Sequence, residues 1–341
     1  MLKNKWNIGI IGCSDMGKQH IKGALKNEKA VLYALCDSAP ERIKEAAEEF
    51  KPQVAVTDYR ELVNDPNLDA VILVVPDQVH LEMTEAFLRA GKAVLCEKPM
   101  ALSLEECQKM IAVEREVGGQ LMIGQVCRFT PAFVKAKELV SSGRIGELMF
   151  VESEYAHNYS VARGYADWRV VPERHGFIGG GCHAVDLLRW IAGDPTEVFA
   201  YANHKGLPDW PCDDTAIAVY KFPNNVMGKV FVSIGCRRNY TMRSVFYGTK
   251  GTIICDNTSP DLTLFEADAN DSHESYNKPQ LIPIKLADHN TTGEIEMFLE
   301  ALTEGKPMPV SSTEGASTVA VCVATVESTK SGKPVDIKYP F

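Results

Sequence analysis

The sequence predicts two domains: a doubly wound parallel α/β domain over residues 1–125, and an α+β domain with a large, mostly antiparallel sheet over residues 126–341. The chain of 341 residues is longer than a usual single domain. In its first part, apolar strand-like runs without polar alternation are separated by helical patterns, which is typical of a parallel sheet covered on both faces. After residue 125, long strand-like runs follow one another directly, which favours antiparallel pairing.

The first domain is expected to alternate strands with helices. Pro40 opens one helix at its first turn, Gly91 ends another, and Ser103 followed by Glu106 forms a capping box. The expected strands are 6–12, 30–36, 53–57, 69–75, 92–98 and 120–126, and the expected helices are 15–27, 40–50, 58–63, 80–91 and 103–119.

The second domain is expected to begin with one helix and to continue as a series of strands. Turn sequences such as PNN and GTKG separate several of these strands, and two further helical patterns lie near the end of the chain. The expected strands are 147–157, 196–204, 214–222, 226–235, 243–249 and 251–257, and the expected helices are 131–143, 292–305 and 312–332.

Composition and charge narrow the function classes. Hydrophobic residues make up 45% of the chain and charged residues 24%, as in a globular protein with a large core. The formal net charge of −9 at pH 7 argues against binding to nucleic acid, which depends on Lys and Arg neutralising phosphates. The amino-terminal apolar run is too short for a signal peptide, and no run reaches the roughly 20 apolar residues of a membrane span. We therefore expect a cytoplasmic protein with neither a nucleic acid nor a membrane as partner.

The ten cysteines are scattered singly, mostly inside apolar segments. None forms a CxxC pair, so the sequence predicts neither a metal site nor a disulfide framework. Free thiols in a reducing compartment fit this pattern.

Residues 9–17, GIIGCSDMG, follow a strand pattern and open a helix pattern. In a G-x-G-x-x-G turn at such a place, backbone N–H groups and the amino end of the helix face a pyrophosphate. Ser14 replaces the second glycine; it narrows the backbone approach, but its hydroxyl can donate a hydrogen bond to a phosphate oxygen. The alternative is a tight connection without a ligand. The residues expected to bind the cofactor in this turn are Gly12, Ser14, Asp15, Met16 and Gly17.

Asp37 strengthens the dinucleotide interpretation. It ends the second strand, twenty residues after Gly17, where an acidic side chain accepts hydrogen bonds from ribose hydroxyls. The same carboxylate would repel a 2′-phosphate, so NAD(H) is favoured, while the nearby Arg42 keeps NADP(H) possible. The alternative role for Asp37 is that of a turn residue before Pro40.

Two more segments resemble the Gfo/Idh/MocA family of glucose–fructose oxidoreductase and inositol dehydrogenase type proteins. A V-P-x-x-x-H turn contains Val75, Pro76 and His80, and an E-K-P sequence contains Glu97, Lys98 and Pro99. The family's opening of the second domain and its H-x-x-D helix are matched by Arg128, Phe129, Pro131, Gly143, Gly146, His183 and Asp186.

The resemblance covers nearly the whole chain. It implies a Rossmann domain, an open-faced antiparallel sheet domain, and oxidoreductase chemistry on sugars or cyclitols. It also implies a homodimer or homotetramer in which the sheet forms the interface. Further cofactor contacts are expected from Val75, Pro76, His80, Glu97, Lys98 and Gln125.

Hydride transfer from an alcohol carbon requires a group that takes the hydroxyl proton. Lys98 follows the fifth strand, at the carboxyl edge where such sheets bind ligands, and is the expected catalytic proton acceptor. The resemblance gives His183 a catalytic or substrate-binding role, with a helix cap or core residue as the alternative. Asp186 lies on the same helix face and is expected to orient the imidazole or bind a hydroxyl, or else to stabilise the helix amino end.

The sequence departs from the family four residues before His183. Sugar dehydrogenases of this type commonly have Asp or Asn there, but this chain has Gly179. Asp167 is the nearest candidate to replace that side chain; otherwise the substrate is bound differently.

Residues 157–177 form a long irregular segment rich in Tyr, Trp, Arg and His, and loops of this kind are often functional. Aromatic faces stack on sugar C–H surfaces, and Arg binds hydroxyls or a carboxylate. Each of these residues could instead serve packing or the surface. The expected substrate-binding residues are Lys98, Arg128, Tyr155, His157, Trp168, Arg169 and His183.

The sequence therefore predicts an NAD(P)-dependent oxidoreductase of the alcohol dehydrogenase type (EC 1.1.1), acting on a sugar, sugar derivative or cyclitol. Two alternatives stay open. One is a non-catalytic, NAD-bound sensor or regulatory protein, which Gly179 favours. The other is redox-neutral sugar cleavage or epimerisation assisted by NAD.

Overall fold

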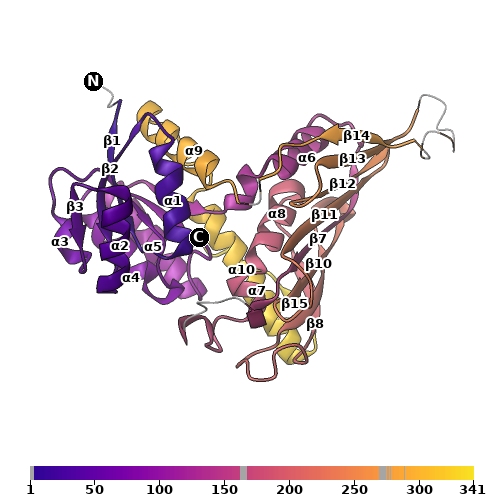
Figure 1. Ribbon diagram of the computed structural model, residues 1–341. Coiled ribbons are helices and arrows are strands. Elements are labelled where there is room, and N and C mark those ends of the chain that lie inside the picture. Colours follow the sequence, from indigo (N-terminus) through magenta and orange to yellow (C-terminus); the bar gives the residue numbers. More distant parts are fainter. Residues whose placement is uncertain (1–3, 162–166, 269–273, 275, 277, 288) are drawn as a thin grey trace. The chain divides into compact units, whose positions relative to one another are not determined.

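A computed structural model describes residues 4–161, 167–268, 274, 276, 278–287 and 289–341 (Figure 1). Its contacts divide the chain into two compact units. The first unit contains the chain up to Val126, together with Asn290–Ala316 and Pro340–Phe341. The second contains Cys127–His289 and Ser317–Tyr339. The final quarter of the sequence thus contributes residues to both units.

The first unit is built on a six-stranded sheet in the order β3-β2-β1-β4-β5-β6, and all its strand pairs are parallel. This order confirms the predicted doubly wound Rossmann topology, in which β1 and β4 meet at the point where the strand order reverses. β4 and β5 are buried along their whole length, which explains their unbroken apolar sequences. The strands are β1 (Trp6–Ile11), β2 (Ala30–Cys36), β3 (Val54–Val56), β4 (Ala70–Leu73), β5 (Ala93–Glu97) and β6 (Leu121–Gly124).

Helices cover this sheet at the positions that the sequence predicts. The capping box is confirmed, because Ser103 Oγ accepts a hydrogen bond from the Glu106 N–H at 3.3 Å. α1 packs against α9, which returns from the far end of the sequence, and α4 packs against α5. The helices are α1 (Asp15–Leu25), α2 (Pro40–Phe50), α3 (Arg60–Val63), α4 (His80–Arg89), α5 (Leu104–Val117) and α9 (Thr291–Glu304).

The second unit contains a nine-stranded sheet in the order β14-β13-β12-β11-β7-β10-β9-β8-β15. Its pairs are antiparallel except for β7 with β10, which confirms the predicted mostly antiparallel sheet. The strands are β7 (Leu148–Ala156), β8 (Glu197–Asn203), β9 (Thr215–Lys221), β10 (Met227–Ser233), β11 (Thr241–Gly248), β12 (Gly251–Asp256), β13 (Asp261–Glu266), β14 (Gln280–Pro283) and β15 (Val335–Asp336).

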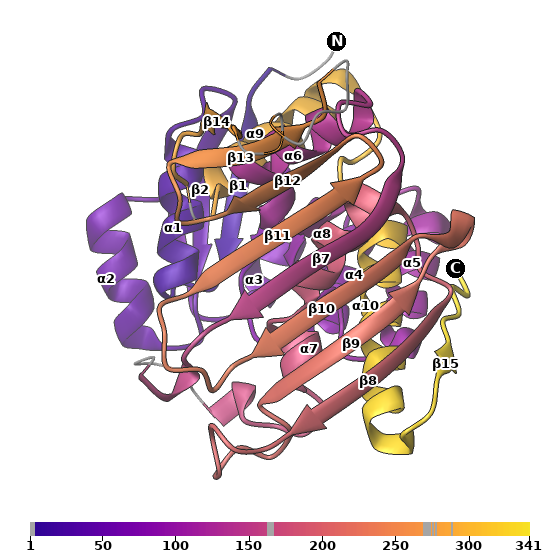
Figure 2. The same cartoon turned by 90° about the vertical axis from the view of Figure 1, so that its right-hand side faces the viewer.

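Helices cover one face of this large sheet, and the other face is open (Figure 2). Strand β9 shows this clearly, because its buried and exposed residues alternate. On the open face several large apolar side chains are exposed, among them Tyr201, Ile217, Val219 and Met227. The covering helices are α6 (Pro131–Ser141), α7 (Gly176–Gly179), α8 (Cys182–Ala192) and the second-unit part of α10 (Ser312–Ser331).

Three strands of the second unit, β13, β14 and β15, have no counterpart among the predicted strands. They lie at or next to the two edges of the sheet, and β15 contains only two residues. β14 and β15 are too short to show a strand period. β13 does alternate, with Leu262 and Leu264 buried, and the prediction overlooked this pattern. Among the described helices, none is both long and apolar enough to cross a membrane.

Candidate functional site

The turn between β1 and α1 requires glycine at two positions. Gly12 has a φ of +100°, and a Cβ placed there would lie 2.1 Å from the Val74 carbonyl oxygen. A Cβ on Gly17 would lie 2.0 Å from the Gly12 carbonyl oxygen. Ser14 is the N-cap of α1, and its side chain makes no capping hydrogen bond. The hydroxyl and the first N–H groups of α1 can therefore face an anion.

Asp37 is buried at the end of β2 and connects two main-chain segments. Its Oδ2 accepts a hydrogen bond from the Cys13 N–H at 2.8 Å, and its Oδ1 accepts one from the Ala39 N–H at 2.9 Å. Each carboxylate oxygen has a second lone pair, so these bonds leave acceptor capacity for ribose hydroxyls. The half-exposed Arg42 guanidinium lies 3.6 Å from Oδ2. Asp37 thus fixes the glycine turn and also fits the predicted ribose site.

His80 joins the two turns that carry the family resemblance. Its Nδ1 lies 3.0 Å from the Pro99 carbonyl oxygen, and its Nε2 lies 3.2 Å from the Val75 carbonyl oxygen. Burial opposes a charge on His80, but the Cys96 side chain, Asp77 and the Pro99 carbonyl outweigh it and raise the pKa to about 10. An imidazolium can donate to both carbonyls. Since both ring nitrogens face the main chain, His80 holds these two turns together, and its expected cofactor contact stays a prediction.

The end of β5 carries Glu97 and Lys98. Glu97 Oε1 lies 2.9 Å from His20 Nε2, and its Oε2 accepts a hydrogen bond from the Lys98 N–H at 3.1 Å. Burial disfavours the Glu97 carboxylate, but His20 and Lys98 outweigh burial and lower its pKa to about 2. Glu97 is therefore an anion that fixes the main chain at Lys98. The Lys98 side chain itself is only partly buried.

Glu294, on α9, is a member of this group that sequence reasoning missed. It is fully buried, and one ligand atom from each of His20, Glu97 and Glu294 lies within 4.8 Å of the others. In the described part of the chain, neither Glu294 oxygen has a hydrogen-bond partner. Burial and the negative charge of Glu97 raise the pKa of Glu294 well above its ordinary value, although Lys98 opposes them. Its neutral, protonated form is therefore favoured relative to an exposed glutamate.

Gln125 follows β6 and is 1% exposed. Within the residues that the structure describes, neither the oxygen nor the nitrogen of its side-chain amide has a hydrogen-bond partner. Buried amides without partners are costly in free energy, and a bound ligand with donors and acceptors would satisfy this one. This observation fits the predicted cofactor contact of Gln125.

In the second unit, His183 lies in the first turn of α8. A Cβ on Gly180 would come within 2.5 Å of the Tyr155 ring, so the glycine lets this ring lie against the start of the helix. The Tyr155 and His183 rings stack with their centroids 6.1 Å apart. His183 Nδ1 lies 3.4 Å from Cys127 Sγ. Close packing thus holds the imidazole in a defined position.

Further aromatic and histidine side chains gather around Tyr155. Its hydroxyl lies 3.2 Å from His157 Nδ1 and 2.9 Å from the Tyr159 hydroxyl. The Tyr240 hydroxyl lies 3.0 Å from His289 Nε2, and the His289 ring centroid lies 5.4 Å from that of His183. The structure therefore brings the predicted residues Tyr155, His157 and His183 together. Cys127, Tyr240 and His289 join them without any local sequence signal.

Asp186 and Arg128 form a buried ion pair. Arg128 Nε and Nη2 donate to the two Asp186 carboxylate oxygens at 2.7 and 2.8 Å, and the Thr318 hydroxyl donates to Oδ1 at 2.8 Å. Asp186 is fully buried and Arg128 is 6% exposed. These three hydrogen bonds fix Asp186 and Arg128 against each other and so stabilise α8. The expected catalytic role of Asp186 and substrate role of Arg128 stay predictions.

The place left by Gly179 is filled by an arginine. A Cβ on Gly179 would lie 2.3 Å from Arg174 Nη1, and Arg174 Nη2 donates to the Gly179 carbonyl oxygen at 3.2 Å. The Trp168 ring lies 5.0 Å from the Arg174 guanidinium and 3.9 Å from that of Arg169. Trp168, Arg169 and Arg174 therefore form a cationic and aromatic group. The side chain of Asp167, predicted to replace the missing carboxylate, lies outside the described residues.

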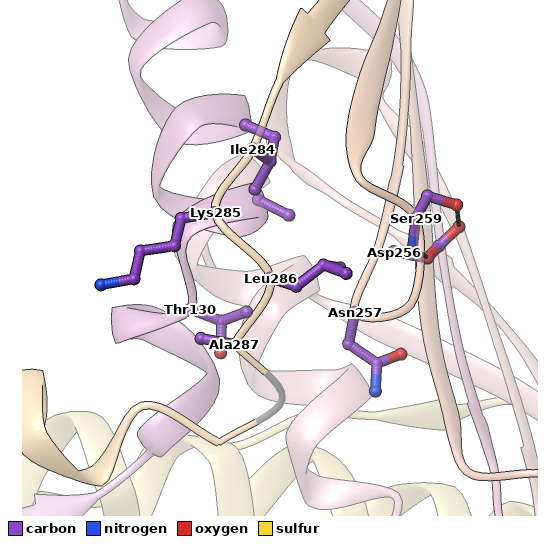
Figure 3. A pocket seen from close by; sticks show the side chains of 9 residues that line it. Thr130, Asp256, Asn257, Ser259, Ile284, Lys285, Leu286 and Ala287 are labelled. Atoms are coloured by element: carbon purple, nitrogen blue, oxygen red, sulfur yellow. Dashed lines mark hydrogen bonds between the residues drawn. The ribbon is translucent and has the colours of Figure 1, made fainter.

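The second unit also has a small hollow (Figure 3), and the N–H of its lining residue Thr130 donates to the Cys127 carbonyl oxygen at 3.2 Å. Leu286 points from the segment after β14 toward the end of β12, where the Ser259 hydroxyl donates to Asp256 Oδ2 at 2.8 Å. No predicted site residue lines it. The lining residues are Thr130, Ala132, Asp256, Asn257, Ser259, Ile284, Lys285, Leu286 and Ala287.

The raised pKa of Glu294 predicts a pH-dependent stability difference for Glu294→Gln. Because the folded-state pKa lies above the unfolded value of about 4.3, this carboxyl stabilises the fold fully only below that value. Its contribution is lost as the pH rises, at ~1.4 kcal/mol per pH unit, until the folded pKa is reached. Urea unfolding at pH 5 and pH 8 should show the variant gaining stability relative to wild type at the higher pH. The exposed Glu296→Gln on the same helix is the control, and a pH-independent difference contradicts the assignment.

The Arg128–Asp186 pair predicts a large stability loss for Asp186→Asn. Removing one charge leaves the other buried and unpaired, which destabilises the fold by about 3–5 kcal/mol. Replacing both partners, as Arg128→Met with Asp186→Leu, should destabilise it far less. Urea unfolding followed by circular dichroism measures both variants. Equal losses in the single and double variants would show that charge pairing is not the cause.

Comparison with known proteins agrees with this architecture. A family described as "Oxidoreductase family, NAD-binding Rossmann fold" matches residues 6–125, and the GFO/IDH/MocA C-terminal domain matches residues 133–254. Inositol 2-dehydrogenase 2 of Saccharopolyspora erythraea is 31% identical over 253 residues, which is 72% of each chain. The uncharacterized oxidoreductase YrbE of Bacillus subtilis is 29% identical over 337 residues, covering 97% of this chain and 96% of YrbE.

A solved structure shows the same fold along the whole chain. It is a levoglucosan dehydrogenase in complex with NADH and levoglucosan, and it superposes with a TM-score of 0.88. The similarity covers 98% of this chain and 100% of that one, at 23% sequence identity. Together with the family matches, the glycine turn and the E-K-P strand end, this confirms the resemblance seen in the sequence. The chain belongs to the Gfo/Idh/MocA family and is an NAD-binding oxidoreductase of the sugar and inositol dehydrogenase type.

Proposed function

We propose that this protein is an NAD(H)-dependent dehydrogenase or reductase acting on a hydroxyl or carbonyl group of a cyclitol, sugar or sugar derivative. The observation that carries the proposal is the surface at the carboxyl ends of the parallel strands. The glycine turn, Asp37 and the E-K-P end of β5 are held there by buried hydrogen bonds within one unit. The name of the relative at 31% identity, an inositol 2-dehydrogenase, supports a polyol substrate.

The first unit offers groups that match each part of NAD. The N–H groups at the start of α1, with Ser14, Asp15 and Met16, would hold the pyrophosphate, and Asp37 would accept hydrogen bonds from the ribose. Val75, Pro76 and Gln125 would line the nicotinamide end. When bound, the cofactor supplies a hydride acceptor or donor. The buried Asp37 carboxylate favours NAD over NADP, whose 2′-phosphate would bring a second negative charge close to it.

Lys98 is the proposed acid–base group. Oxidation of a secondary alcohol releases a hydride from carbon and a proton from oxygen, and a neutral Lys98 amine would take that proton; reduction of the carbonyl returns it. Glu97 fixes the main chain of Lys98 through the 3.1 Å bond to its N–H. His183 is proposed to bind the reacting hydroxyl, while Tyr155 and His157 offer ring faces and polar atoms to the rest of a polyol.

Two alternatives to a dehydrogenase stay open, a regulatory NAD-bound protein and a redox-neutral sugar-converting enzyme. In place of a carboxyl group at Gly179 the structure has the Arg174 guanidinium, which cannot accept a proton from a substrate. Among the observations on this chain, this one is the strongest argument for a regulatory NAD-bound protein instead of a dehydrogenase. Redox-neutral cleavage or epimerisation would use the same Lys98 and His183 and would yield no net NADH.

The Lys98→Met variant tests the proposed reaction. We expect wild-type protein with NAD⁺ to form NADH when inositols, anhydrosugars or sugar acids are added one at a time. The rate should fall by about 10²–10⁴-fold in Lys98→Met, because proton transfer is lost while the cofactor site remains. The exposed Lys109→Met in the same unit serves as the control.

Three results would separate the alternatives. Unchanged turnover in Lys98→Met would remove Lys98 from the mechanism. NAD⁺ binding without conversion of any compound would favour the regulatory role. Conversion of a sugar without accumulation of NADH, seen by chromatography of the products, would identify redox-neutral chemistry.

We also propose that the open face of the nine-stranded sheet is covered by a second copy of the chain. Ile217 and Val219, on β9, are 41% and 51% exposed on this face. Large exposed apolar patches of this kind mark association surfaces. The double variant Ile217→Lys, Val219→Glu should show a lower mass than wild type in light scattering after gel filtration. The control is Lys109→Glu, and an unchanged mass in the double variant would contradict the proposal.

A further inference from the structure

We propose that Cys127, His183 and His289 form a binding site for one zinc-like divalent metal ion. The three residues come from distant parts of the sequence, and all belong to the second unit. One ligand atom from each, the Cys127 sulfur and one ring nitrogen of each histidine, lies within 4.8 Å of the other two. Cys127 Sγ and His183 Nδ1 are 3.4 Å apart.

These distances fit a tetrahedral metal centre. Zinc binds thiolate sulfur at about 2.3 Å and imidazole nitrogen at about 2.0–2.1 Å, so two ligand atoms at the tetrahedral angle lie roughly 3.5 Å apart. The observed sulfur–nitrogen separation already has this value. The His289 atom lies within 4.8 Å of the other two, so a movement of its side chain would bring it to the same distance.

The ligand types select the class of metal. One thiolate with two imidazoles suits zinc and its borderline-soft neighbours, whereas magnesium and calcium prefer oxygen ligands. Three protein ligands leave one tetrahedral position for water or a substrate oxygen, as in catalytic zinc sites. Cys127 and His183 are each 2% exposed, but His289 is only partly buried, which leaves an approach from solvent.

Neighbouring aromatic residues would hold the histidines in place. The Tyr240 hydroxyl lies 3.0 Å from His289 Nε2, so with a metal on the other ring nitrogen it can accept the Nε2 proton. Such hydrogen bonds orient metal-bound imidazoles. The stacked Tyr155 ring fixes the plane of His183.

Binding is a simple exchange. The Cys127 thiol releases its proton to solvent, the sulfur–metal bond forms, and the hydrogen-bonding contact between Cys127 and His183 is replaced by two bonds to the ion. No electron is transferred. The binding inference does not depend on hydride transfer. A bound ion would polarise the oxygen of a hydroxyl held at His183. Only this consequence of metal binding rests on the proposed function.

The other candidate cluster, His20, Glu97 and Glu294, carries no such inference. Both Glu97 oxygens already take part in internal hydrogen bonds, so a metal ion would compete with the His20 and Lys98 N–H contacts.

Cobalt(II) is the probe that tests the site directly, because cobalt bound to thiolate shows an intense near-ultraviolet charge-transfer band. Full-length protein is treated with EDTA, freed of the chelator and titrated with CoCl₂. We expect the thiolate band to saturate at one equivalent and to disappear when zinc is added. The matched variants are Cys127→Ser and Cys255→Ser, since both replace a buried cysteine of the second unit.

The expected pattern is loss of the band in Cys127→Ser and retention in Cys255→Ser. His289→Gln, at a partly exposed position where folding is little affected, should weaken cobalt binding at least 10-fold. Absence of a thiolate band in folded wild type, or its persistence in Cys127→Ser, overturns the inference. Neither readout involves NAD turnover, so the failure of the proposed reaction and the failure of the metal site are separate results.

Discussion

The buried carboxylate of Asp37 is the interaction on which the cofactor surface depends. It binds the Cys13 N–H inside the glycine turn and the Ala39 N–H before α2, so the loops after β1 and β2 have one fixed relation to each other. Similar buried hydrogen bonds occur along the sheet. His80 connects the loop after β4 to the E-K-P turn, and Glu97 connects β5 to His20 on α1. Leaving a buried polar group of this kind unpaired costs about 1–3 kcal/mol, so each tie strongly favours one loop conformation.

In the second unit, an ion pair and close packing hold His183 in place. The buried Arg128–Asp186 ion pair fixes α8, and Gly180 lets the Tyr155 ring lie against the start of this helix. His183 is therefore held on a rigid helix rather than on a mobile loop, which is the condition for a precise binding site. Around it the chain places the sulfur of Cys127, the imidazole of His289 and the phenol groups of Tyr155 and Tyr240. The His183 imidazole could bind either the metal ion or the substrate hydroxyl at one time, unless the hydroxyl binds to the ion.

The sequence was informative wherever the signal is local. Apolar runs and caps such as Ser103 located nearly all helices and strands, and the glycine turn with Asp37 indicated where a dinucleotide would bind. The edge strand β14 was missed because its four residues are too few to show a strand period. The ion pair of Asp186 with Arg128 was not predicted, because a contact between residues 58 positions apart leaves no spacing rule in the sequence. Glu294 and His289 were missed for the same reason: their partners lie far away along the chain, and no single-sequence pattern joins them.

The most direct test of the account is a calorimetric titration of the purified protein with NAD⁺ and, separately, with NADP⁺. The Asp37 carboxylate and the glycine turn predict one equivalent of NAD⁺ bound per chain and weaker binding of NADP⁺. Tighter binding of NADP⁺ would contradict the role given to Asp37. No binding of either dinucleotide would contradict the account as a whole.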